Sequence, residues 1–231
     1  MDYGETPPAG QALADRSIAG AVVDALRGEI IHGQLRPGER LRQDAVATRF
    51  RVSQTVVREA FKDLIRECFL VAEPRRGVSV ATMSADEAEE MTTLRSLIEP
   101  QALAWAIPRL TEVQFEAAER VLKELDDEKN VDRIILLNAR FHRGLYAAAN
   151  RPRTLTTVET LRLGFERYLR YTWEFTTHRD RSQQEHWELL AMCKQGEVDN
   201  ACRLLTQHIR ATGDLLVECL AKRPVEQSSK L

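Results

Sequence analysis

No apolar run in this sequence approaches the length of a membrane span, and the N-terminus lacks the basic and then apolar pattern of a secretion signal. Cysteine is scarce as well: Cys68, Cys193, Cys202 and Cys219 show none of the paired spacings that are typical of a metal site. These absences argue against a membrane protein and against a disulfide framework. We expect a cytoplasmic protein with reduced thiols and no membrane partner.

No charge of one sign dominates, because the 231 residues carry a formal net charge of -2. The charge is unevenly distributed, however. Residues 16–82 hold 12 Lys and Arg against 8 Asp and Glu, whereas residues 83–231 hold 21 against 24. The positive excess of the first segment has the sign that attracts phosphates. A chain of this length fits one large domain or two ordinary ones.

Residues 45–70 are predicted to form two short helices joined by a tight turn, with Ser53 as the N-cap of the second helix. One face of that helix is apolar and consists of Val57, Ala60, Phe61 and Leu64. Polar residues lie away from this stripe: Gln54, Thr55, Arg58 and Lys62. Arg can pair with guanine and Gln with adenine, while Lys and the helix N-terminus hold phosphates. The face therefore suits major-groove reading, although an ordinary solvated helix face has the same pattern.

The flanking segments favour DNA binding. Residues 18–32 are predicted to be helical, and Pro37 and Gly38 then end the helix in a turn. Downstream, two short β-rich pieces, 69–72 and 78–81, surround a cationic tip. This predicts the hairpin wing of a winged helix, in which Arg75 and Arg76 meet backbone phosphates and Gly77 permits close approach to the groove.

Three motifs of this segment occur in a fixed order: I-x-x-G-x-L-x-P-G-x-x-L, then V-S-x-T-x-V-R-E-A, then R-G-V-x-V. They resemble the GntR family of bacterial transcription regulators over residues 18–82. The resemblance implies DNA contacts at Thr55 and Arg58 and, with a changed sequence preference, at Gln54. Gln43, Gln54 and Val56 depart from the family pattern, which usually has Glu, Arg and Pro at these places.

From Ser84 onward the sequence shows no strand pattern. Ser84 and Glu87 form a capping box at the start of the first helix, in which Pro100 is expected to cause a kink or a break. The expected helices cover 84–107, 111–129, 131–149, 152–175, 179–195 and 197–221. The predicted fold is mostly α: a winged helix-turn-helix followed by an antiparallel bundle of six or seven helices. The expected divisions are a tail (1–15), the winged helix (16–82), the bundle (83–222) and a second tail (223–231).

His142, His186 and His208 fall on the inward faces of three different predicted helices, and Asn138 lies four residues before the first of them. A single inward histidine is usually a hydrogen-bonded core residue. Three of them in one bundle each need a partner once buried, and a shared divalent metal would satisfy all three. The pattern therefore predicts a metal site in the bundle.

The second half also carries recurrent motifs: L-R-x-x-I-E-P-x-A, F-H-x-x-L, an Ala-Ala-Asn run, E-H and Q-H-I. In their order and spacing, these motifs resemble those of the FCD ligand-binding domain of the FadR subgroup. The resemblance covers residues 86–221. The resemblance implies a metal, with zinc favoured over nickel or manganese, held by Asn138, His142, His186 and His208. Metal-binding members carry Asp where Asn138 stands, so the neutral amide should bind metal more weakly, and a metal-free polar pocket is the alternative.

Arg95 lies on an otherwise apolar inward row, where a guanidinium suits a carboxylate. Its partner is either an acidic effector or an internal residue such as Glu99. By resemblance, the chain is a homodimeric regulator, most often a repressor, that binds an approximately palindromic operator and responds to a small organic acid. The alternatives are a regulator in which the metal itself is the signal and, with less support, a metal-dependent hydrolase.

Overall fold

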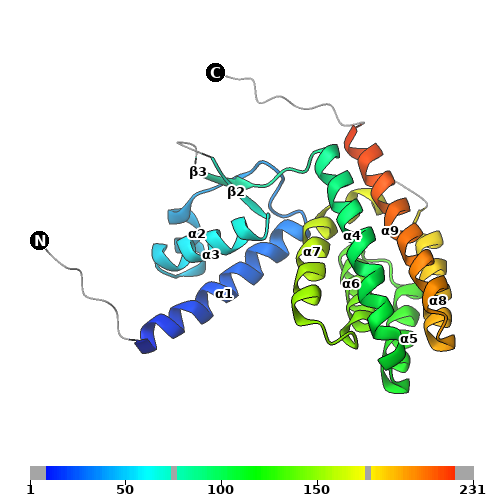
Figure 1. The fold of residues 1–231 in the computed structure, drawn as a ribbon. Helices are drawn as coiled ribbons and strands as arrows, with labels where there is room; N and C mark the ends of the chain where they lie inside the picture. The colour runs from blue at the N-terminus through cyan, green and yellow to red at the C-terminus, as the bar shows by residue number, and fades with distance from the viewer. Residues whose placement is uncertain (1–8, 74–76, 175–177, 222–231) are drawn as a thin grey trace, which may run out of the picture. The chain divides into compact units, whose positions relative to one another are not determined.

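The computed structural model describes residues 9–73, 77–174 and 178–221 (Figure 1). The chain divides into two compact units, Met1–Thr82 and Met83–Leu231. Arg75 and Arg76 of the expected wing lie outside the described residues, as do residues 1–8 and the expected tail 223–231.

The first unit is a winged helix-turn-helix, as predicted. Its helices are α1 (Ala9–Ile31), α2 (Gln43–Phe50) and α3 (Gln54–Arg66), and its strands are β1 (Arg40–Leu41), β2 (Leu70–Glu73) and β3 (Gly77–Val80). The strands form an antiparallel sheet in the order β1-β3-β2. Two details differ from expectation. The helix expected to begin at residue 18 begins at Ala9, so residues 9–15 are helical, and the two-residue strand β1 was not predicted.

Helix α3 forms for the reasons that its sequence suggested. The Ser53 hydroxyl accepts a hydrogen bond from the Val56 amide at 3.3 Å, which caps the first turn. The expected apolar face, Val57, Ala60, Phe61 and Leu64, is buried. This face packs in the interior of the unit, where α1 contacts α3. The preceding helix α2 ends at Arg51, which adopts a left-handed conformation with φ of 56°.

The second unit is all-α within the residues that the structure describes (Figure 1). It consists of α4 (Ala85–Ala106), the short 3-10 helix η1 (Ile107–Arg109), α5 (Glu112–Asp127), α6 (Val131–Ala147), α7 (Pro152–Glu174), α8 (His178–Gln195) and α9 (Val198–Ala221). The capping box at Ser84 and Glu87 is present, with hydrogen bonds of 2.7 and 3.1 Å. Pro100 does not divide the first helix, since α4 runs through it.

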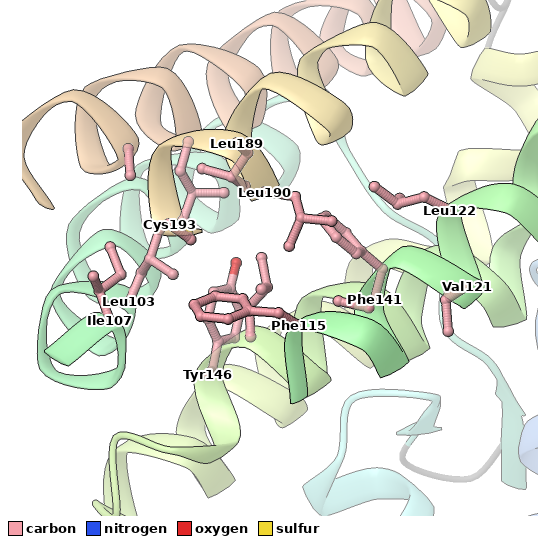
Figure 2. Close-up of a cluster of buried hydrophobic side chains, with 14 of the residues drawn as sticks. Leu103, Ile107, Phe115, Val121, Leu122, Phe141, Tyr146, Leu189, Leu190 and Cys193 are labelled. Carbon is pink, nitrogen blue, oxygen red and sulfur yellow. The ribbon is translucent and has the colours of Figure 1, made fainter. Parts of the chain in front are cut away.

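The core of this unit lies between α4, α5, α6, α8 and α9. Figure 2 shows Phe115, Phe141 and Tyr146 with aliphatic side chains of the neighbouring helices gathered around them. Phe141 and Leu189 are almost completely buried. None of the helices in the described part of the chain combines the length and apolar character that a membrane span requires.

Helices α4 and α9 lie close together at Gly213. A Cβ atom added there would lie only 2.7 Å from the Cβ of Thr92. Thr92 cannot easily turn away, because it is buried and its hydroxyl donates to the Ala88 carbonyl at 2.7 Å. The glycine is therefore required by packing rather than by backbone conformation.

We expect Gly213→Ala to destabilise the protein by about 1–3 kcal/mol, because the added methyl group forces α4 and α9 apart. The matched control is Gly144→Ala in α6, where nothing lies within 4 Å of an added Cβ. Alanine should stabilise that helix by about 0.5–1 kcal/mol. Urea unfolding of both variants measures the difference, and equal stabilities would contradict the close packing.

Candidate functional site

Three histidines from three helices meet inside the second unit. His142 of α6, His186 of α8 and His208 of α9 are all buried, as the sequence predicted, and one ring nitrogen of each lies within 4.8 Å of the others. The Nε2 atoms of His142 and His186 are 3.2 Å apart. The ring centroids are separated by 4.8 to 5.5 Å. This spacing is short enough for the three rings to share one ion.

His142 is oriented through its second nitrogen. Its Nδ1 atom lies 3.2 Å from the hydroxyl of Tyr146, and that hydroxyl donates to Glu99 at 2.8 Å. Because the hydroxyl proton is already given to Glu99, the Tyr146 oxygen accepts and His142 Nδ1 carries the donated proton. The Nε2 atom of His142 is then left with a lone pair.

The other two rings are held in the same way. The Nδ1 atom of His186 donates to the amide oxygen of Gln183 at 3.2 Å, and the Nδ1 atom of His208 donates to the Glu185 carboxylate at 2.9 Å. An amide oxygen and a carboxylate only accept, so the Nδ1 atom of each ring carries a proton, and the Nε2 atom is the one that has the lone pair in the neutral ring. Histidine ligands of metals are commonly oriented by such contacts on the nitrogen that faces away from the metal.

Electrostatics keep the rings of His142 and His186 neutral. Burial lowers the pKa of His142 and of His186 well below the usual value for histidine, and the positive charge of Arg162 lowers both further. Two neutral rings whose lone pairs face each other at 3.2 Å repel each other. A cation between them would turn this repulsion into coordination.

A cavity of about 20 Å³ adjoins the histidines, which is room for roughly one water-sized group. Its walls consist of Arg95, Asn138, His142, Arg162, Glu166, Ser182, His208, Ile209 and Thr212. A second cavity of the same volume also borders Asn138 and Ser182, together with His186. Asn138 thus borders both cavities, one together with His142 and His208 and the other together with His186.

A buried ionic network forms the opposite wall. Glu99 is fully buried and receives Arg95 Nε at 2.6 Å and an Arg162 nitrogen at 3.2 Å. Burial alone would raise the pKa of the Glu99 carboxyl, but the two guanidiniums outweigh this effect and lower it. Arg162 also contacts Glu166 at 3.3 Å, and burial raises the pKa of that carboxyl. Arg95 therefore has the internal partner Glu99 and also faces the cavity.

Sequence reasoning missed several residues of this site. Tyr146, Arg162, Glu166, Gln183 and Glu185 were not singled out. Spacing offered a signal for some of them, since Tyr146 follows His142 by one helical turn and Gln183 precedes His186 by three residues. Nothing local indicated that Arg162 would reach Glu99, which is 63 residues away.

The expected DNA-reading side chains lie on the exposed face of α3, opposite its buried stripe. Gln54, Thr55 and Arg58 are exposed, and Lys62 pairs with Glu59 at 2.8 Å. Gly77 begins β3 with φ of 89°, a conformation that glycine adopts without strain.

Two family profiles match the chain. The profile "Bacterial regulatory proteins, gntR family" covers residues 18–80, and the profile "FCD domain" covers residues 90–211, more than half of the chain. The chain is a GntR-family regulator with an FCD domain. This confirms the resemblance of residues 18–82 to the GntR family and the resemblance of the second half to an FCD domain.

Individual relatives agree with the family assignment. The regulator is 25% identical over 189 residues to the "Nta operon transcriptional regulator" of Aminobacter aminovorans, covering 80% of this chain and 88% of the relative. It is 26% identical to the "HTH-type transcriptional repressor RspR" of Escherichia coli, covering 80% and 82%. These relatives are transcription regulators, so the hydrolase alternative is set aside.

Solved structures show the same fold. "E. coli McbR/YncC" matches with a TM-score of 0.77 and 23% identity, over 87% of this chain and 97% of that one. A GntR family member from Pseudomonas syringae pv. tomato is 31% identical with a TM-score of 0.56, over 94% and 91%. The regulator therefore binds DNA and controls transcription, as members of its family do.

We expect Glu99→Gln to destabilise the regulator by about 3–5 kcal/mol, because Arg95 and Arg162 would lose the charge that compensates them in the interior. The matched control is Glu119→Gln. Glu119 is a half-exposed carboxylate that pairs with Lys123 and Lys194 at the surface, so this change should cost much less stability than Glu99→Gln. Chemical denaturation of the two variants provides the comparison, and similar midpoints would refute the role given to Glu99.

Proposed function

We propose that this regulator is a homodimeric repressor whose affinity for its operator is controlled by a small organic acid bound beside a divalent metal in the FCD domain. One observation carries the proposal: three buried histidines from three helices place one ring nitrogen each within 4.8 Å of the others. The name of the relative RspR as a repressor supports the direction of regulation. A regulator of bacterial DNA acts in the cytoplasm.

The donor set fits a divalent metal. His142, His186 and His208 would each supply a nitrogen, and the Asn138 amide oxygen would be a neutral fourth ligand. Imidazole ligands suit zinc best, and nickel and manganese are also compatible with a mixed nitrogen and oxygen set. When bound, the metal would act as a Lewis acid that holds a carboxylate oxygen. Tyr146 and Glu185 would keep two of the rings in position.

The cavity wall suits the acid itself. Arg95 and Arg162 both border the cavity, and a guanidinium can pair with a carboxylate through two parallel hydrogen bonds. Both arginines already share Glu99, so an incoming carboxylate would compete with Glu99 for their remaining N–H groups. Because the cavity of about 20 Å³ holds only about one water-sized group, an acid would bind an arrangement in which this network has opened, and would shift the population toward that arrangement.

On the DNA side, α3 would enter the major groove. Gln54, Thr55 and Arg58 would face base edges, while Ser53, Lys62 and Gly77 would lie close to the backbone. Arg75 and Arg76 complete this proposed set at the wing. Two copies in a dimer would read the two halves of an approximately palindromic operator.

For the metal site, we expect about one metal per chain in untagged protein, and its loss in His186→Ala. The control is His32→Ala, which removes an exposed histidine outside the site. Elemental analysis after incubation with zinc, nickel or manganese provides the measurement. Wild-type protein that remains metal-free would show that Asn138 and the three histidines are not metal ligands. A DNA affinity that changes with the metal concentration at a constant concentration of the acid would favour the alternative in which the metal itself is the signal.

For DNA, Arg58→Ala should weaken binding to a duplex that the wild-type protein selects from a random pool by about 5- to 150-fold, because a bidentate base contact contributes about 1–3 kcal/mol. Arg120→Ala, at an exposed arginine of α5, serves as the control. Fluorescence anisotropy gives both affinities. Equal affinities for the two variants would remove Arg58 from the base-reading set.

A further inference from the structure

A groove in the DNA-binding unit remains unassigned. It has a volume of about 680 Å³ and lies between β1, the start of α2, the start of α3 and the start of β3. It is lined by Arg40, Leu41, Arg42, Gln43, Asp44, Gln54, Gly77 and Val78. The groove thus connects the first residue of the recognition helix with the first described residue after the wing tip.

The two arginines that line this groove are accessible to solvent. Arg40 is exposed, and the side chain of Arg42 is 79% exposed. Arg42 is tied to Asp44 by two hydrogen bonds, 3.1 Å from Nε and 2.8 Å from a terminal nitrogen. Hydrogen bonding from Arg42 lowers the pKa of the Asp44 carboxyl, so the pair is fully ionised.

Folding does not require this pair. Exposed ion pairs contribute little to stability. Arg42 occupies the N-cap position of α2 but makes no capping hydrogen bond with its side chain. Asp44 also accepts a hydrogen bond from the Ala45 amide, which helps the first turn of α2. The negative charge of Asp44 also interacts favourably with the N-terminal end of α2, and its ion pair with Arg42 is a second role for the same charge.

We propose that the groove binds the sugar-phosphate backbone of one DNA strand through Arg40 and Arg42. Asp44 lowers the affinity for DNA, because its carboxylate holds Arg42 in an ion pair in the free protein. The phosphates of a strand whose bases face Gln54 lie beside the N-terminal end of α3, where the groove begins. At the opposite rim, a Cβ added at Gly77 would have no atom within 4 Å, so the approach is open. The inference rests on DNA binding, which the family assignment supplies.

Duplex DNA fits this groove better than a small anion does. Arg40 and Arg42 are two residues apart in extended backbone, so both line the groove from positions about 6–7 Å apart along the chain. A backbone that presents successive phosphates can meet both of them. On binding, a phosphate would take the place of the Asp44 carboxylate at Arg42, and the displaced carboxylate would oppose further binding.

The test uses the full-length protein and two labelled duplexes, one of random sequence and one selected from a random pool. Binding is measured by fluorescence anisotropy over a series of salt concentrations. Arg42→Gln and Arg40→Gln should each lower the slope of log affinity against log salt by about 0.9 and weaken both duplexes alike. An unchanged slope in both variants would overturn the proposal.

Asp44→Asn provides the sharper test, because it keeps the oxygen acceptor and removes only the charge. It should raise affinity for both duplexes about two- to fivefold, the size expected for relief of one exposed like-charge contact. This gain should disappear in the Arg42→Gln background. An unchanged or lower affinity in Asp44→Asn would show that the charge of Asp44 does not weaken DNA binding. A gain that persists without Arg42 would show that any such effect does not act through Arg42.

The matched control is Arg49→Gln. Arg49 belongs to α2, as Asp44 does, and it is also ion-paired. Its partner is Glu29 of α1, however, and Arg49 does not line the groove. In Arg49→Gln the slope of log affinity against log salt should equal that of wild type. If the slope fell as much as in the groove variants, the loss of one positive charge anywhere on the unit would explain the result.

Arg58→Ala distinguishes base reading by α3 from backbone binding in the groove. It should weaken the selected duplex more than the random one, whereas the groove variants weaken both equally.

Discussion

The interior of the FCD domain depends on one carboxylate that water does not reach. Glu99 meets two guanidiniums and the Tyr146 hydroxyl, and so joins α4, α6 and α7 at a single point. A buried charge of this kind is tolerated only when opposite charge and hydrogen bonds surround it. Through Tyr146 the same carboxylate also sets the orientation of His142. The histidine cluster is therefore held in place by a residue that is not a candidate ligand.

Much of the fold could be predicted because its signals are local. The apolar stripe of α3, its Ser53 cap and the capping box at Ser84 each depend on residues within one or two turns, and all three are observed. Two features had no comparable signal. The two-residue strand β1 exists only because β3 pairs with it, and the early start of α1 at Ala9 follows no capping residue that the sequence displays.

The candidate site shows the same division. Periodicity placed His142, His186 and His208 on inward faces, and the bundle then brought them together. The residues that orient or surround them could not be found in this way. Glu99 lies one turn from Arg95 and was a visible partner, whereas Arg162 approaches from another helix. Sequence patterns indicate which face of a helix is buried, but contacts between helices depend on how the whole bundle packs.

The capping box at Ser84 has a mechanical consequence. The DNA-binding unit ends at Thr82, and α4 begins at Ala85 with its first turn already closed by two reciprocal hydrogen bonds. The same helix carries Arg95 and Glu99 further along. A continuous helix thus runs from Arg95 and Glu99 back to Ala85, three residues after the end of the DNA-binding unit. Because the capping box closes the first turn of α4, a shift of Arg95 or Glu99 would move the start of the helix as well, instead of being lost in an unravelled first turn.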